Sequence, residues 1–349
     1  MIFNVNSVLA GILSTRSYRK ETFYHLIYEW EDDLANYLKI PVLNATPLYR
    51  KFVINRVIRK LATLVGSGMW RKLNNFIETT NIIRPPNGYY FAFEIGVKDF
   101  HDFSTSKRAI PVFIDLWKPI DLISFEDIYK ECPLVLISSL ETMEYLQERK
   151  CKLNVAHLPL SLSDRYQAKP GLMYEKTYDI LLTGRTNPVL RKFLDKFMQD
   201  QPEVELVAQQ EVNGELVYVS NKKGPLGKFD SREEYIQLLR ASKIAFYTTP
   251  GIDGGERRTG GFNPVTPRLL ELLSAQCLVV ARYPDNADTR FYELNRVCPN
   301  VDSYAQFEEL LLKYLQSTSV PVSLYEEIVR RHATSRRAEE LQHLLKQLS

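Results

Sequence analysis

The segment from Gly260 to Asp285, GGFNPVTPRLLELLSAQCLVVARYPD, constrains the fold of this chain more than any other. Its first part combines two glycines and two prolines, and its second part is almost entirely apolar. Thr266 is a favourable N-cap and Pro267 suits the first helical position, so a helix is expected to begin at Pro267. The run from Cys277 to Ala281 has no polar face, which is typical of a parallel strand covered on both sides. The segment therefore predicts a glycine-bearing loop, a buried helix and a buried strand, in that order.

The same alternation of strand-like and helical segments continues along the chain. Strands are expected at residues 23–28, 88–95, 110–117, 133–139 and 153–160, and again at 178–183, 204–208, 243–249 and 277–281. Helix signals lie between them, such as Ser138 or Ser139 as a cap before LETMEYLQERK and the capping box Ser231-x-x-Glu234. Strands that alternate with helices form βαβ units with parallel strands. We therefore expect an α/β fold with doubly wound, Rossmann-like sheets.

The length of the chain and one polar segment predict two domains. A single core stops growing near ~250–300 residues, and this chain has 349. At residues 161–177 the alternation is interrupted by SLSDRYQAKPGLMYEKT, which is polar and contains Pro170-Gly171. We place one domain at residues 1–165 and a second, with the carboxyl-terminal helices, at residues 166–349. Ligands of such sheets bind beyond the carboxyl ends of the strands, so a cleft between the domains is the expected site.

Composition and charge exclude several classes of function. The formal net charge is only +3, so nucleic-acid binding is not predicted. No apolar run approaches the ~20 residues of a membrane span, and the N-terminus lacks a basic start before an apolar stretch. The four cysteines have no CxxC spacing and are expected to be reduced thiols in or near the core. We therefore expect a cytoplasmic protein.

Two strand–loop–helix turns in the second half have the character of anion sites. In YDILLTGRTNPVLRKFL, Gly184 permits a tight turn, Asn187 is the expected cap and Pro188 opens a helix. Cations in the loop and first helical turn, among them Arg185 and Arg191, oppose the helix dipole, so a bound anion would relieve an electrostatic cost. The alternative is a solvated basic helix end.

The second turn is the loop that precedes Pro267. Here Arg268 and Glu271 lie three residues apart on one helix face. A carboxylate beside a diphosphate site could accept hydrogen bonds from ribose hydroxyls. The alternative is a helix-surface ion pair worth ~0.3–0.5 kcal/mol.

Several common motifs are absent from the sequence. There is no GxGxxG, and GPLGK (224–228) lacks the upstream glycine and the Ser or Thr of a P-loop. There is no HExxH and no Asp-x-Asp pair that could hold a metal on a diphosphate, and the five histidines have no metal-ligand spacing. We therefore expect no metal site and no cofactor.

The order of YDILLTG, EEYIQLLRASKIAFYTTPG and NPVTPRLLELLSAQCLVVARYPDNADT, over roughly residues 178–315, resembles the carboxyl-terminal domain of GT-B glycosyltransferases of the bacterial group 1 class. The resemblance implies that Glu271 holds the ribose of a sugar donor and that loop and helix-start residues hold its diphosphate. Asn263 stands eight residues before Glu271, where retaining members of the class often carry another glutamate, so the stereochemical outcome stays open. The residues that the two turns and the resemblance together assign to donor binding are Gly184, Arg185, Arg191, Asn263, Thr266, Arg268 and Glu271.

The resemblance also implies an activity. It predicts a metal-independent, hexosyltransferase-like enzyme that moves a sugar from a nucleotide-diphosphate sugar, with UDP-sugar as the first choice, to a glycan or lipid-linked glycan. The implied setting is bacterial surface-polysaccharide assembly, meaning O-antigen of lipopolysaccharide or capsule. The alternatives are a transferase that uses a nucleotide-monophosphate sugar and an inactive GT-B-like assembly partner.

The first domain should supply the acceptor site and any catalytic base. Glu29 and Asp32, in YEWEDDLANYL, follow an expected strand, and Asp115 lies at the end of another, IPVFIDLW. A carboxylate in such a position could deprotonate an acceptor hydroxyl. The alternatives are acidic residues that favour a helix dipole, for the first two, and a helix or loop cap, for Asp115.

The segment from Arg50 to Leu73 is expected to form a basic amphipathic helix. Its apolar residues follow helical spacing, and Arg56, Arg59 and Lys60 lie mainly elsewhere. One interpretation is a core-facing helix with a solvated face. The other is a peripheral contact with anionic lipid on the inner face of the cell membrane, which would suit a lipid-linked acceptor.

Overall fold

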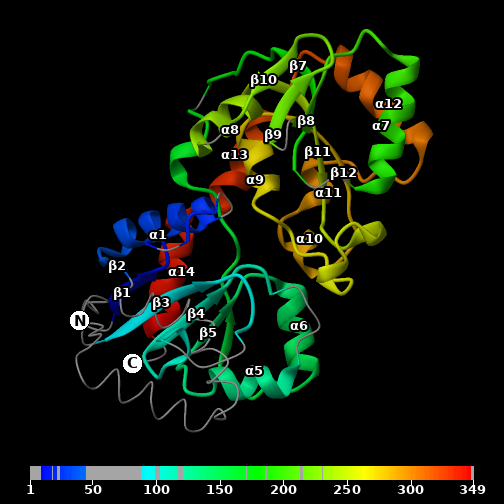
Figure 1. Cartoon of the computed structure of the whole chain (residues 1–349). Helices are drawn as coiled ribbons and strands as arrows, with labels where there is room; N and C mark the ends of the chain where they lie inside the picture. The colour runs from blue at the N-terminus through cyan, green and yellow to red at the C-terminus, as the bar shows by residue number, and fades with distance from the viewer. Residues whose placement is uncertain are drawn as a thin grey trace. The chain divides into compact units, whose positions relative to one another are not determined.

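The structure, a computed structural model, describes residues 9–17, 19–21, 24–44, 88–98, 103–116, 121–169, 171–184, 187–212, 215–229 and 231–346 (Figure 1). The chain forms two compact units, one of Met1–Leu160 with Thr334–Ser349 and the other of Ser161–Ala333. The first unit thus ends five residues before the expected boundary and also contains the last helix, α14 (Thr334–Lys346), which was expected in the second domain. The physical reason is that Ala338, Leu341 and Leu345 of α14 are buried in the core of the first unit.

The first unit contains a parallel six-stranded sheet in the order β2-β1-β3-β4-β5-β6. Its strands are β1 (Leu9–Ser14), β2 (Val42–Asn44), β3 (Tyr89–Glu94), β4 (Ala109–Phe113), β5 (Val135–Ile137) and β6 (Val155–His157). Helices α1 (His25–Leu38) and α14 pack against one face, and α5 (Leu122–Tyr129) and α6 (Leu140–Glu148) pack against the other. A short 3-10 helix, Phe103–Thr105, precedes β4.

The expected strand at residues 23–28 is wrong, because α1 begins at His25. Ile27, Trp30, Leu34 and Leu38 are all buried, and their spacing follows one face of a helix. Residues 25–28 of this run are therefore the first turn of the helix that was expected to follow it. The strand that precedes this helix is β1, which was not expected.

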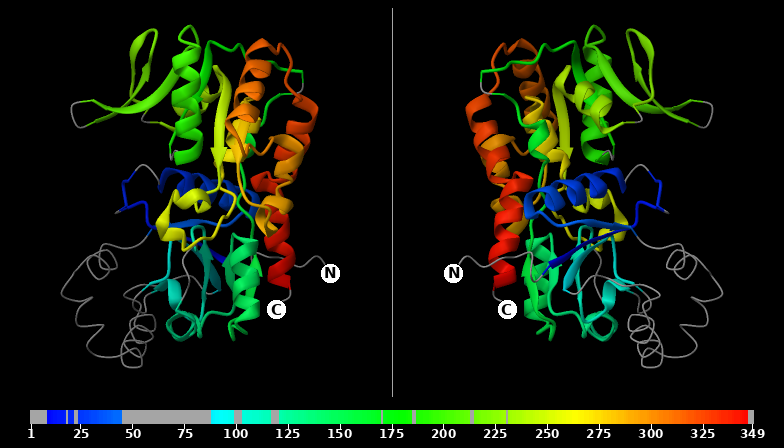
Figure 2. Two further views of the ribbon diagram at one scale, coloured as in Figure 1. Left: turned by 90° about the vertical axis from the view of Figure 1, so that its right-hand side faces the viewer. Right: turned by 90° about the vertical axis from the view of Figure 1, so that its left-hand side faces the viewer.

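The second unit contains a mixed six-stranded sheet in the order β10-β9-β8-β7-β11-β12. Its strands are β7 (Tyr178–Leu182), β8 (Leu206–Val212), β9 (Glu215–Ser220), β10 (Gly224–Gly227), β11 (Ser242–Thr248) and β12 (Leu278–Arg282). The four strands expected from the sequence, β7, β8, β11 and β12, are mutually parallel, whereas β9 and β10 add an antiparallel edge (Figure 2).

Helices cover both faces of this second sheet. On one side pack α7 (Pro188–Asp200) and α12 (Tyr304–Gln316), and on the other α8 (Arg232–Arg240), α9 (Arg268–Ser274) and α13 (Val322–Arg331). Short helices α10 (Ala287–Phe291) and α11 (Leu294–Val297) follow β12, and 3-10 turns lie at Asp164–Tyr166, Ile252–Gly254 and Arg257–Thr259. Both units are therefore Rossmann-like and doubly wound, which confirms the expected α/β fold class.

Local signals in the sequence place several helix ends correctly. Asn187 caps α7, Ser139 caps α6, and Ser231 forms a capping box with Glu234 at the start of α8.

The four cysteines are free, and three of them, Cys132, Cys277 and Cys298, are buried. In the described ranges, no helix is both long and apolar enough to span a membrane.

Candidate functional site

The turn after β7 brings a glycine against an arginine from a distant helix. Gly184 has a φ of 65°, in the left-handed region that favours glycine. A Cβ at this position would lie 2.1 Å from Nη1 of Arg268, so no larger residue fits without displacing the guanidinium. That guanidinium donates a hydrogen bond to the carbonyl of Thr183. The carboxyl end of β7 is therefore in contact with the first residue of α9.

Helix α9 begins one residue later than expected, and Thr266 is not its cap. The N-cap is Pro267, which has no side chain able to cap, and the helix is seven residues long. The backbone N–H of Thr266 donates to the Tyr247 hydroxyl at 3.0 Å, and its carbonyl accepts from the N–H of Leu269 at 3.2 Å. Because the loop meets β11 through Tyr247, tertiary contacts set the start of this helix.

Glu271 forms an ion pair with Arg232 of α8 and not with Arg268. Nη2 of Arg232 lies 2.8 Å from Oε1 of Glu271, and the two side chains are 20% and 5% exposed. The alternative of a surface pair between Arg268 and Glu271 is therefore wrong. The partner of Glu271 comes from another helix, and sequence reasoning missed it because no local spacing connects residues 232 and 271.

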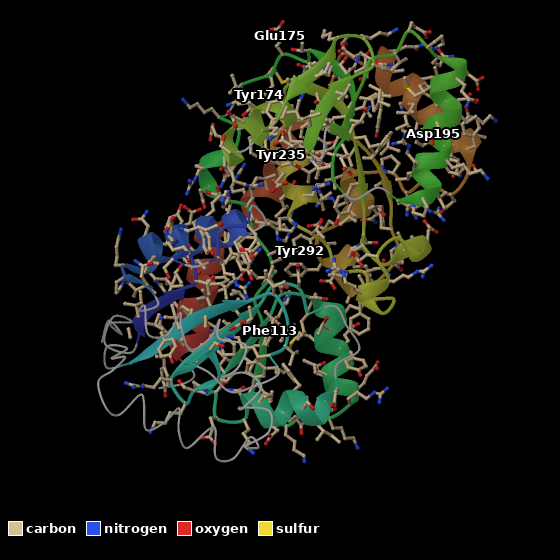
Figure 3. The ribbon with its side chains drawn as sticks, viewed as in Figure 1. Phe113, Tyr174, Glu175, Asp195, Tyr235 and Tyr292 are labelled. Carbon is tan, nitrogen blue, oxygen red and sulfur yellow. The ribbon has the colours of Figure 1, made fainter. Side chains whose placement is uncertain are left out.

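Aromatic side chains surround this ion pair. The guanidinium carbon of Arg232 lies 5.7 Å from the ring centroids of both Tyr166 and Tyr235. Figure 3 labels Tyr235, which lies on α8 where this helix packs against α9. Thr183 Oγ1 and the Tyr218 hydroxyl are 2.7 Å apart, and burial raises the pKa of both Tyr218 and Tyr235. These tyrosines are neutral at physiological pH, so they add no charge to that of Arg232, Arg268 and Glu271.

The turn before α7 satisfies its own helix terminus. Oδ1 of Asn187 accepts hydrogen bonds from the N–H groups of Val189 and Leu190, as its expected role as cap requires. Its Nδ2 donates to Asp253 at 2.8 Å. Arg191 forms an exposed ion pair with Asp195 at 2.8 Å on its own helix, so the structure does not bring it to the cluster around Glu271. Arg185 lies outside the described residues.

Asn263 holds the loop between β11 and α9 together. Its Oδ1 accepts a hydrogen bond from Thr249 at 2.9 Å, and its Nδ2 donates to the carbonyl of Gly261 at 2.7 Å. Its own carbonyl accepts from Asn286 at 3.0 Å. The side chain that stands in the place of a second glutamate is thus part of a buried network within the loop.

In the first unit, a polar cluster lies at the carboxyl end of β1. Ser14 donates to Oε2 of Glu31 at 2.5 Å, and Arg16 contacts Glu31 at 3.0 Å and Asp32 at 2.7 Å. Glu31 is 1% exposed, and its burial raises its pKa to about 7, although the hydrogen bonds from Ser14 and Arg16 act in the opposite direction. Asp32 is 51% exposed. The cluster therefore combines one buried carboxyl that titrates near neutral pH with one accessible carboxylate.

The other two candidate carboxylates of the first unit lie elsewhere. Glu29 is buried on α1, and Asp115 is half-buried just beyond β4. The first turn of α1 contains no acidic residue, so the helix-dipole explanation for Glu29 and Asp32 is wrong. His157 is the last residue of β6. Burial lowers its pKa from 6.5 to about 4, so this imidazole is neutral at pH 7.

The basic segment from Arg50 to Leu73, which was expected to form an amphipathic helix, lies outside the described residues. Within them, no group of three or more His, Cys, Asp or Glu side chains is placed to hold a metal ion.

Comparisons with known proteins give weak likenesses to solved structures. No family model and no curated protein matches the chain. It resembles the pneumococcal O-GlcNAc transferase GtfA in complex with UDP and GlcNAc with a TM-score of 0.45 and 12% identity, over 80% of this chain and 60% of that one. For a mutant of S. aureus TarM in complex with UDP, the values are 0.47 and 12%, over 77% and 53%. For a putative UDP-N-acetylglucosamine 2-epimerase from Listeria monocytogenes, they are 0.46 and 10%, over 90% and 85%.

Proposed function

We propose that this protein is a glycosyltransferase that takes its sugar from a nucleoside diphosphate donor, with UDP as the first choice of nucleotide. The observation that carries the proposal is the cluster of Arg232, Arg268 and Glu271 beside Gly184, at the carboxyl edge of a doubly wound sheet. Ligands of such sheets bind at that edge. The cluster combines a carboxylate for ribose hydroxyls with guanidinium groups for phosphate oxygens, which are the two polar parts of a nucleoside diphosphate.

In the proposed reaction, the bond between the sugar C1 and the diphosphate oxygen breaks and a bond from C1 to an acceptor oxygen forms. The diphosphate leaves with the bonding electron pair, and fixed cations stabilise its developing charge. The acceptor proton goes to a carboxylate of the first unit, for which Glu29, Asp32 and Asp115 are the candidates. No step of this scheme calls for a metal ion.

The first expected result is binding of UDP to the chain of 349 residues. UDP at about 100 times its dissociation constant should add about 2.7 kcal/mol of stability, because a ligand of the folded state stabilises it by mass action. Calorimetry and thermal shift with UDP, GDP, ADP, dTDP and CMP would measure it. A CMP preference would favour a nucleotide-monophosphate sugar, and the absence of heat with every nucleotide would support an inactive partner instead.

Substitution of Glu271 tests whether UDP binds at this cluster. Glu271→Gln should weaken the binding of UDP by about 1.5–3 kcal/mol, the range for hydrogen bonds to a charged group. A loss of melting temperature with unchanged affinity for UDP would instead assign Glu271 to structure alone.

We further propose that the acceptor is a glycan or a lipid-linked glycan in bacterial surface-polysaccharide assembly, and that the enzyme works in the cytoplasm at the membrane surface. The segment Arg50–Leu73 is then expected to confer binding to anionic liposomes that weakens as salt rises, because each Lys or Arg near such a surface contributes about 1 kcal/mol. Co-sedimentation of the wild type and of a variant with Arg56, Arg59 and Lys60 changed to Gln tests this. Equal sedimentation of both proteins would exclude a lipid-binding role for these side chains.

A further inference from the structure

Arg232 is held in a fixed place by its own helix and its neighbours. It is the first residue of α8, directly after Ser231, whose hydroxyl accepts from the N–H of Glu234 at 3.1 Å while the Glu234 carboxylate accepts from the N–H of Ser231. This capping box fixes the backbone at Arg232. The side chain is 20% exposed and reaches across to α9, where it contacts Oε1 of Glu271.

The two arginines of the cluster have different partners. Arg232 is paired with the carboxylate of Glu271. The guanidinium of Arg268 donates to the backbone carbonyl of Thr183. Because a carbonyl carries no net charge, the anionic oxygens of a phosphate would be stronger partners for Arg268.

A nucleoside diphosphate changes the partners within this cluster. Its ribose hydroxyls donate to carboxylate oxygens, so they compete with Arg232 for Glu271. Its phosphates are acceptors and anions, so they offer Arg232 a replacement for the carboxylate. The same ligand thus supplies a substitute for each half of the ion pair.

We propose that Arg232 is a donor-binding residue: it holds Glu271 while the site is empty and binds the phosphates once the ribose takes Glu271. This inference rests on the proposed function and adds to it a residue that neither the motifs nor the resemblance assigns. The competing explanation is that the ion pair only ties α8 to α9.

The two explanations predict different effects of Arg232→Gln on the affinities for UDP, UMP and uridine. We expect the variant to bind UDP about 10- to 100-fold more weakly, because a charged hydrogen bond to phosphate is lost. Uridine has no phosphate and gains access to Glu271, so its affinity should stay equal to that of the wild type or rise. The change in affinity for UMP should lie between the changes for UDP and uridine. Calorimetry for UDP and UMP, and ligand-observed NMR for uridine, provide the three affinities.

A second variant and a matched control keep this test decisive. Arg232→Gln leaves Glu271 without its partner, so the double variant Arg232→Gln, Glu271→Gln, compared with Glu271→Gln alone, removes the stray charge and should still show the loss for UDP. Arg232→Lys should retain part of the affinity for UDP. The control is Arg240→Gln on the same helix, where the guanidinium stacks over Tyr174 at 4.8 Å; it should leave UDP and uridine affinities unchanged.

The outcomes separate this inference from the proposed function. If uridine and UDP weaken by the same factor in Arg232→Gln, or if neither changes, Arg232 has only the structural role. If the wild type binds no nucleotide, the proposed function itself is contradicted. If the wild type binds UDP and Arg232→Gln keeps the wild-type ratio of UDP to uridine affinity, only the role of Arg232 is overturned.

Discussion

Replacing Gly184 with alanine is expected to destabilise the second unit by about 2.5–5 kcal/mol. An alanine at a left-handed backbone position costs about 1–2 kcal/mol. The new Cβ would also meet Nη1, Nη2 and Cζ of Arg268 at 2.1 to 2.5 Å, which forces the guanidinium away from the Thr183 carbonyl. Loss of a hydrogen bond from a charged group adds about 1.5–3 kcal/mol. Thermal unfolding followed by circular dichroism would measure the change.

Gly171 provides the matched control for this substitution. It has a φ of 77°, and a Cβ there would have nothing within 4 Å. Gly171→Ala should therefore show only the backbone cost of about 1–2 kcal/mol. Gly184→Ala should in addition weaken UDP binding, because Arg268 loses its place. Equal losses of stability in the two variants would mean that Arg268 moves aside without penalty, and that its contact with Thr183 contributes little.

The second large effect is a pH dependence of stability in the first unit, caused by Glu31. Burial raises the pKa of this carboxyl from 4.5 to about 7 in the folded state. The folded state thus binds the proton more tightly than the unfolded state, so the stabilisation is complete below pH 4.5 and is lost as the pH rises to 7. At about 1.4 kcal/mol per pKa unit, the loss is about 3 kcal/mol.

His157 acts in the opposite direction over nearly the same range. Its pKa is lowered from 6.5 to about 4 by burial, so its contribution is present above pH 6.5 and is lost as the pH falls to 4. The wild type should therefore show a flat profile between pH 4.5 and 6.5. Glu31→Gln should lose stability towards acid pH, and His157→Gln should gain it.

Tryptophan fluorescence in urea is a suitable measurement, because the three tryptophans, Trp30, Trp70 and Trp117, all belong to the part of the sequence before residue 161. Titrations at pH 4.5, 5.5, 6.5 and 8 on the wild type and both variants complete the design. If the stability gap between the wild type and Glu31→Gln is constant from pH 4.5 to 8, Glu31 ionises as an ordinary carboxyl paired with Arg16.

Runs of apolar residues and local caps allowed the sequence to predict much of the second unit. Most of β7, β11 and β12 and the residues Val207 and Ala208 of β8 are buried, so these runs are largely apolar and can be recognised without knowledge of their neighbours. The caps Asn187, Ser139 and Ser231 contact N–H groups within three residues, so they are properties of short segments. The fold class followed from these local features and was confirmed.

Prediction was less successful where a segment is short or its pattern is shared by two structures. The run at residues 23–28 has the composition of a strand, but its apolar residues continue the face of α1 that packs against the sheet and α14. The antiparallel strands β9 and β10 were missed, although Asn213-Gly214, a frequent hairpin dipeptide, lies between β8 and β9 in the sequence.

The sequence by itself determined the two Rossmann-like halves, their order along the chain and the glycine turn at which the candidate donor site begins. Only the tertiary structure decided which charged and polar side chains contact one another. Glu271 pairs with Arg232, Gly184 contacts Arg268, and Glu31 is buried with Ser14 and Arg16. The physical reason is distance along the chain: a helical spacing of three or four residues can be seen in the sequence, whereas a pair such as Arg232 and Glu271 exists only after α8 and α9 pack on the same face of the sheet.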